Sequence, residues 1–95
     1  MLKPSVFKKF QPGDAVEVVW QDACTMAKWS SVEEAAKLEL ALILTRGTLV
    51  AIREDAMVVA LDAGLQVDGS VSDHHGVGAV PLESVVEIYK LKRVK

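Results

Sequence analysis

Two neighbouring runs of the sequence are predominantly apolar. Residues 41–53 are rich in Leu, Ile, Val and Thr, and residues 56–61 follow after the polar pair at 54–55. This order predicts a β-hairpin whose strands scarcely alternate between apolar and polar residues. A strand that is apolar on both faces must be covered on both. We expect a barrel interior to cover one face, and a helix or a second subunit to cover the other.

Two further strands flank this hairpin in the sequence. Residues 15–20 are rich in valine and place every second residue, ending with Trp20, on one apolar face, as in a half-buried strand. A Pro-Gly-Asp turn at residues 12–14 precedes them. Residues 80–91 are again apolar and predict a closing strand.

One short helix is predicted between the first strand and the hairpin. Ser31 and Glu34 have the spacing of a capping box, in which the serine oxygen accepts a hydrogen bond from the first turn. Apolar residues then recur at helical spacing, so the helix begins at Val32. We place its end near Leu40, and the alternative is a longer helix that runs to Ile43.

These elements predict a single, mostly β domain. Gly47 interrupts the long apolar run, and glycine permits the sharp bend with which a small barrel turns a corner. We expect a small, strongly bent antiparallel barrel of the SH3-like kind with one short α-helix. It spans residues 1–95, with flexible basic ends at 1–10 and 92–95. The alternative is an α+β fold with the longer helix.

A polar, glycine-rich segment precedes the closing strand. Residues 62–78 hold four of the six glycines, three aspartates and both histidines. Such a composition is too polar and too flexible for a core element. We expect a long exposed loop.

No combination of residues in the sequence supports catalysis. Asp73, His74 and His75 offer oxygen and nitrogen ligands, but adjacent histidines in an extended segment point apart, and no ligand pair has the spacing of a metal site. Cys24 is the single cysteine and has no basic neighbour that would activate it. No serine has the surroundings of a known nucleophile motif. We therefore expect no enzymatic activity, no cofactor and no metal.

The better candidates are residues that could contact a protein partner. Trp29 follows the first strand in a loop, where a tryptophan is either a lid over the core or, if exposed, an anchor for binding. Asp22 closes a turn in most such positions, although it could also be a polar contact. The candidate binding residues are Trp29, Asp22, Asp73, His74 and His75.

Charge is distributed very unevenly along the chain. Eleven basic and thirteen acidic residues give a net charge of −2, yet all thirteen acids and only four of the bases lie between residues 10 and 89. If the two ends lie together, their lysines and arginine form one patch that could touch nucleic-acid phosphates. The residues of this alternative nucleic-acid site are Lys3, Lys8, Lys9, Lys90, Lys92, Arg93 and Lys95.

Several short motifs follow one another between residues 12 and 91. They are Pro12-Gly13-Asp14, the strand Val16-Glu17-Val18-Val19-Trp20 with Gln21-Asp22-Ala23, Trp29, Thr45-Arg46-Gly47-Thr48-Leu49, and Val80-Pro81-Leu82 ahead of Ile88 and Leu91. In this order they resemble a group of small SH3-like-barrel proteins of tailed phages and prophages, which carry no assigned activity. The resemblance implies an accessory gene of a mobile element, and no mechanism.

The expected function is therefore binding without catalysis. The chain has one cysteine and no asparagine, and no signal peptide or membrane-length apolar run is evident, so we expect a cytoplasmic protein. The doubly apolar hairpin leaves more hydrophobic surface than one small domain covers, which predicts a homodimer or a small ring. We expect it to act through protein–protein contacts, with nucleic-acid binding as the alternative and a metal-dependent enzyme as a weaker one.

Overall fold

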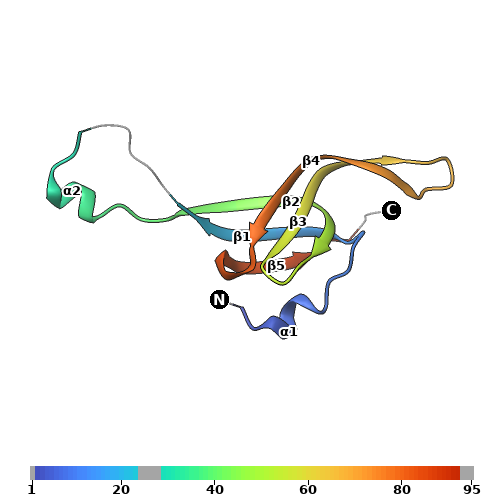
Figure 1. Ribbon diagram of the computed structural model, residues 1–95, viewed down its shortest axis with the longest axis horizontal. Coiled ribbons are helices and arrows are strands. Elements are labelled where there is room, and N and C mark those ends of the chain that lie inside the picture. The colour runs from blue at the N-terminus through green and yellow to red at the C-terminus, as the bar shows by residue number, and fades with distance from the viewer. Residues whose placement is uncertain (1, 24–28, 93–95) are drawn as a thin grey trace.

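The computed structural model describes residues 2–23 and 29–92 of the chain. Its strands form one antiparallel sheet in the order β4-β3-β2-β1-β5, so that β1 is flanked by β2 and by the last strand (Figure 1). The elements in chain order are α1 (Pro4–Phe7), β1 (Ala15–Asp22), α2 (Val32–Ala36), β2 (Ala41–Ile52), β3 (Ala56–Leu65), β4 (Val71–Pro81), the 3-10 turn η1 (Leu82–Ser84) and β5 (Val85–Lys90).

The predicted mostly β class is confirmed, and so are the strands expected at 15–20, 41–53 and 56–61. Closure into a barrel is not present in the described residues. The edge strands β4 and β5 each pair with one neighbour only, so the sheet is strongly bent but open.

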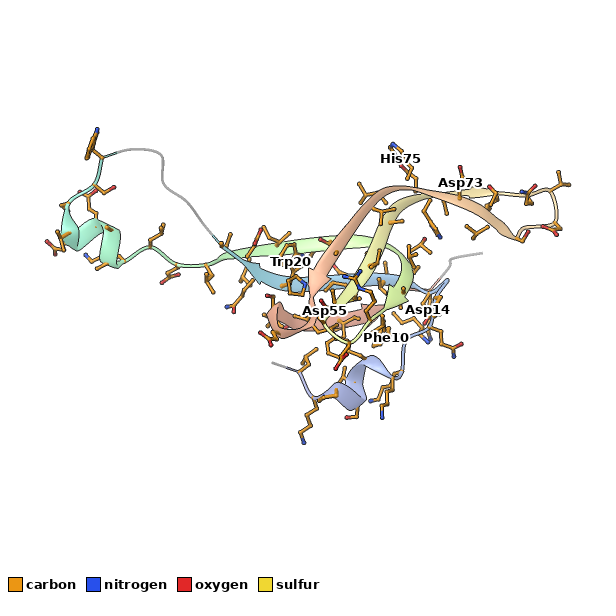
Figure 2. The ribbon with its side chains drawn as sticks, in the orientation of Figure 1. Phe10, Asp14, Trp20, Asp55, Asp73 and His75 are labelled. Atoms are coloured by element: carbon orange, nitrogen blue, oxygen red, sulfur yellow. The ribbon has the colours of Figure 1, made fainter. Side chains whose placement is uncertain are left out.

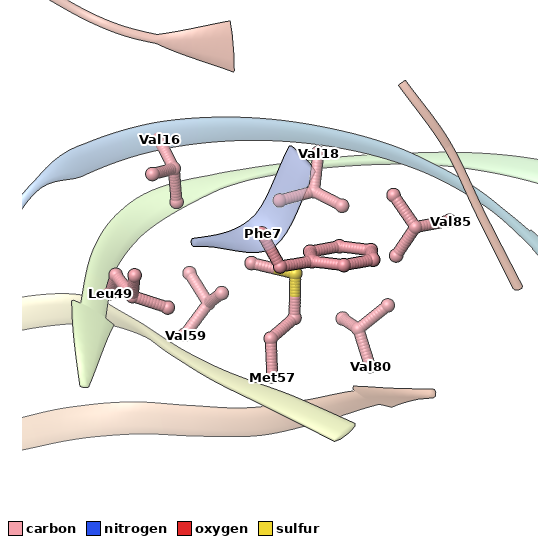
Figure 3. Close-up of a cluster of buried hydrophobic side chains, with 8 residues drawn as sticks. All are labelled: Phe7, Val16, Val18, Leu49, Met57, Val59, Val80 and Val85. Carbon is pink, nitrogen blue, oxygen red and sulfur yellow. The ribbon is translucent and has the colours of Figure 1, made fainter. Parts of the chain in front are cut away.

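A core of valine, leucine, methionine and phenylalanine fills the concave side of the bent sheet. Leu49, Met57, Val16 and Val18 are completely buried, because alternate residues of each strand point to the same face. Figure 3 shows this cluster, whose full membership is Phe7, Val16, Val18, Leu49, Met57, Val59, Val80 and Val85.

The N-terminal segment belongs to this core. Residues 1–10 were expected to be a flexible end, but Pro4–Phe7 forms α1, and the Phe7 side chain is only 6% exposed. Phe10 and Leu2 pack against the same cluster. The two phenylalanines of this segment therefore cover part of the core that the strands alone leave open.

The segment at 62–78 is also ordered differently from the expectation. The predicted loop is wrong: β3 continues to Leu65 and β4 starts at Val71, which leaves a turn at 66–70. Gly69 adopts a positive φ of 88° in that turn, a conformation that glycine adopts without strain. Backbone pairing therefore organises a stretch whose side chains carry little apolar character.

The helix after the first strand begins where the sequence places it. The Ser31 hydroxyl accepts a hydrogen bond from the backbone N–H of Glu34 at 3.1 Å, and α2 starts at Val32. The helix ends at Ala36, so the α+β alternative with a helix to Ile43 is wrong. None of its residues is buried, and it therefore does not supply the expected cover for the apolar strands.

The molecule is long for its mass. Its principal extents are 58 × 29 × 27 Å and its radius of gyration is 16.5 Å, against about 12 Å for a compact chain of this length. Two projections produce this shape, one ending in α2 and one formed by the β3–β4 hairpin, and they extend from opposite sides of the sheet (Figure 1).

Candidate interaction surfaces

The first projection exposes large apolar side chains over its whole length. We call it the α2 arm and define it as residues 20–23 and 29–44. Trp29 is fully exposed, with a relative accessibility of 102%, so the lid that the sequence allowed does not form. The other large hydrophobic residues exposed along the arm are Val32, Leu38, Leu40, Leu42 and Leu44.

The root of the α2 arm is fixed to the sheet. The Trp20 indole Nε1 donates a hydrogen bond to the Thr45 hydroxyl at 3.1 Å, and its ring packs against the core. Asp22 ends β1, where its carboxylate accepts a hydrogen bond from the backbone N–H of Ala23 at 2.8 Å.

The second projection, the β3–β4 tip (residues 61–77), carries the histidines. His75 Nδ1 lies 3.4 Å from an Asp62 carboxylate oxygen, and both side chains are exposed. The adjacent His74 alternates to the other face of β4, where its Nδ1 is enclosed without a hydrogen-bond partner. Asp73 accepts a hydrogen bond from the Ser72 hydroxyl at 2.9 Å.

The structure does not bring the candidate binding residues together. Asp73 and His75 lie on β4 at one end of the molecule (Figure 2), whereas Asp22 and Trp29 belong to the arm at the other end. Within residues 2–23 and 29–92, no three potential metal ligands gather at one place. Cys24, for which the sequence shows no activating basic neighbour, lies outside the described residues.

A groove that sequence reasoning missed lies beneath the sheet. It has a volume of about 900 Å³ and runs between the N-terminal segment on one side and the β2–β3 turn with η1 on the other. Its lining residues are Leu2, Pro4, Phe7, Lys8, Phe10, Pro12, Ile52, Arg53, Glu54, Asp55, Pro81, Leu82 and Glu83. Phe7 and Phe10, which lie in a segment expected to be flexible, were the sequence signal for it.

Lys90, at the end of β5, contacts the segment that follows α1. The Lys90 ammonium lies 3.3 Å from an Asp14 carboxylate oxygen and 5.9 Å from the centroid of the Phe10 ring. The pKa of the Asp14 carboxyl is lowered, first by the backbone N–H of Gln11 that donates to it and then by Lys90. Arg93 and Lys95 of the predicted basic patch lie outside the described residues.

The α2 arm is acidic, whereas the side of the groove formed by α1 is basic. In the described part of the arm, four carboxylates stand against Lys37, whose ammonium lies 3.9 Å from a Glu33 oxygen. On the α1 side, Lys8 lines the groove, and Lys3 and Lys9 lie next to α1 in the sequence. The opposite side of the groove is acidic, with Glu54, Asp55 and Glu83 around Arg53.

The chain matches no family model, no curated protein and no solved structure in the comparisons with known proteins. None of the helices in residues 2–23 and 29–92 has the length and apolar character needed to cross a bilayer.

Proposed function

We propose that this protein is a non-catalytic interaction module that acts by binding another protein through the α2 arm. The observation that carries the proposal is the Trp29 side chain, which is completely exposed at the end of a projection that no other part of the described chain covers. Tryptophan is among the residues that contribute most to protein–protein binding energy, because its large flat surface is desolvated on contact. Large apolar side chains exposed together along one projection, as on the α2 arm, are typical of an interface.

A site-specific crosslinking experiment tests the proposal. A photoreactive phenylalanine analogue replaces Trp29, and the same analogue replaces Val67 as a matched control. Val67 has a relative accessibility of 109% in the turn of the other projection, so both probes are equally available to solvent. We expect covalent protein adducts from position 29 and none from position 67. Absence of adducts at 29, or equal adducts at both positions, contradicts the proposal.

We further propose the SH3-like class and a mobile-element setting. In support of the class, the first four strands form an antiparallel meander, a 3-10 turn precedes the last strand, and β5 returns to pair with β1. The setting rests on the ordered motifs between residues 12 and 91. The neighbouring genes test it: phage structural or early regulatory genes support it, and housekeeping genes on both sides contradict it.

Nucleic-acid binding is the second candidate, and the contact of Lys90 with the N-terminal segment favours it. Lys90 contacts Phe10 and Asp14, which places the end of β5 beside the segment that directly follows Lys8 and Lys9 in the sequence. Affinity for duplex DNA or RNA that falls steeply with salt, and falls further in Lys8→Glu with Lys9→Glu, supports this function. Affinity that does not depend on salt or on these lysines contradicts it.

A further inference from the structure

We infer that the partner of the α2 arm is a second copy of this chain, and that the arm of one copy docks into the groove beside α1 of the next. This inference rests on the proposed function and names the binding partner. The contact is head to tail, because arm and groove are different surfaces of the molecule.

The surface area of the chain supports two such interfaces on each copy. A compact protein of 10.3 kDa exposes about 5,400 Å², whereas this chain exposes 7340 Å². The excess is about 1,900 Å² on this scaling. A standard protein–protein interface covers about 800 Å² on each partner. One arm and one groove per copy together cover about 1,600 Å², which is most of the excess, and the projecting β3–β4 tip contributes to the remainder. A single standard contact leaves more than half of the excess uncovered.

The groove has the chemistry to receive the end of the arm. Its floor is formed by apolar side chains, among them Phe7, Phe10 and Leu82, and its volume of about 900 Å³ accommodates several side chains. The end of the arm offers Trp29 and Val32, which are 102% and 88% exposed. The arm projects away from α1 in its own chain (Figure 1), so it does not fill its own groove.

Charge sets the direction in which the arm enters. Its described carboxylates, Asp22, Glu33, Glu34 and Glu39, outnumber its one described lysine. Lys8 lines the α1 side of the groove, with Lys3 and Lys9 adjacent to α1 in the sequence, whereas the opposite side has three carboxylates around Arg53. Opposite charges across an interface fix the orientation of the partners and speed their encounter. The arm's acidic residues therefore lie along α1 of the neighbouring copy.

A head-to-tail contact has a consequence that a symmetric dimer lacks. Each copy uses its arm on one neighbour and its groove on the other, so the contact repeats until the rotation closes a ring or continues as a filament. A copy without a working arm still offers a groove, and a copy without a working groove still offers an arm.

Mixing two defective variants tests the inference directly. The arm variant is Trp29→Ser, and the groove variant is Lys3→Glu with Lys8→Glu and Lys9→Glu. All four changes are on exposed side chains, so circular dichroism is expected to show an intact fold. Sedimentation velocity at tens of micromolar is expected to give oligomers for the wild type and monomers for each variant alone. Loss of Trp29 should weaken association at least about thirtyfold.

An equimolar mixture of the two variants is expected to form dimers, because one intact arm meets one intact groove. The matched control Val67→Ser should assemble like the wild type. Three results overturn the inference: a monomeric wild type, assembly that either variant leaves unchanged, or a mixture that stays monomeric. A monomeric wild type that still gives adducts to another protein from position 29 overturns only this inference, whereas absence of adducts removes the proposed function as well.

Discussion

Replacement of Gly47 by alanine is expected to destabilise the sheet. Among the glycines that lie inside a strand and face the core, this position should show the largest loss. Gly47 lies on the concave face of β2, where β3 crosses it closely. A Cβ at this position would press against the backbone carbonyl oxygen of Ala60 and would lie 2.9 Å from Cγ1 of Val59. A backbone oxygen cannot turn aside as a flexible side chain can, so the strands must separate.

The expected cost follows from two opposing effects. Overpacking a well-packed core costs about 1–3 kcal/mol. Alanine in a strand regains about 0.5–1 kcal/mol relative to glycine, because glycine loses more conformational freedom on folding. Since the clash involves backbone, we expect the upper part of the first range to remain, a net loss of about 2 kcal/mol in the free energy of unfolding.

Gly78→Ala is the matched control. Gly78 also lies in a strand of the sheet, but a Cβ there meets nothing within 4 Å, so this variant is expected to be as stable as the wild type or slightly more stable. Urea unfolding followed by circular dichroism, at one protein concentration for all variants, gives the two free energies. The reasoning is refuted if Gly47→Ala unfolds within 0.5 kcal/mol of the wild type, or if both variants lose equally.

Three further predictions concern single side chains. Phe7→Ala should lower the free energy of unfolding by about 3–5 kcal/mol, because it empties a core position; a change below 1 kcal/mol by urea unfolding would show that α1 is not part of the core. The lowered pKa of Asp14 means that its contribution is present above the pKa of the unfolded chain and is lost as pH falls through the folded value, so Asp14→Asn should flatten the acid limb of a pH-stability profile. The hydrogen bond from Tyr89 to Glu87 at 2.7 Å raises the pKa of the phenol, and ultraviolet titration should place it above 10 and lower it in Glu87→Gln.

The strands and the helix start were predictable because each depends on neighbouring residues. The alternation at 15–20 and the apolar runs after Leu40 identify three strands, and the Ser31 cap identifies the start of α2. The β3–β4 hairpin was not predictable in the same way. Its ordered structure depends on backbone hydrogen bonds between the two strands. Such bonds form regardless of the polarity of the side chains on those strands.

The groove could not be predicted because it depends on contacts between distant parts of the chain. Phe7 is separated by more than forty residues from Leu49 and Met57, yet all three share one core. When only its own residues are considered, a short helix flanked by lysines predicts a solvent-exposed chain end. Trp29 was a reasonable candidate from its type, but only its exposure distinguishes an anchor from a lid.

Strands that are apolar on both faces need both faces to be buried, and the chain itself buries only one of them. The concave face is covered by the core and α1, while Leu42 and Leu44 on the other face remain 66% and 52% exposed. Complete burial of a leucine side chain contributes about 1.5–3 kcal/mol, so each leaves much of this energy unused in the isolated chain. The α2 arm cannot gain this stabilisation by itself, because a five-residue helix is too short to be stable without packing. Under the proposed assembly the neighbouring copy supplies that packing, so ordering of the arm and association of the copies are one equilibrium.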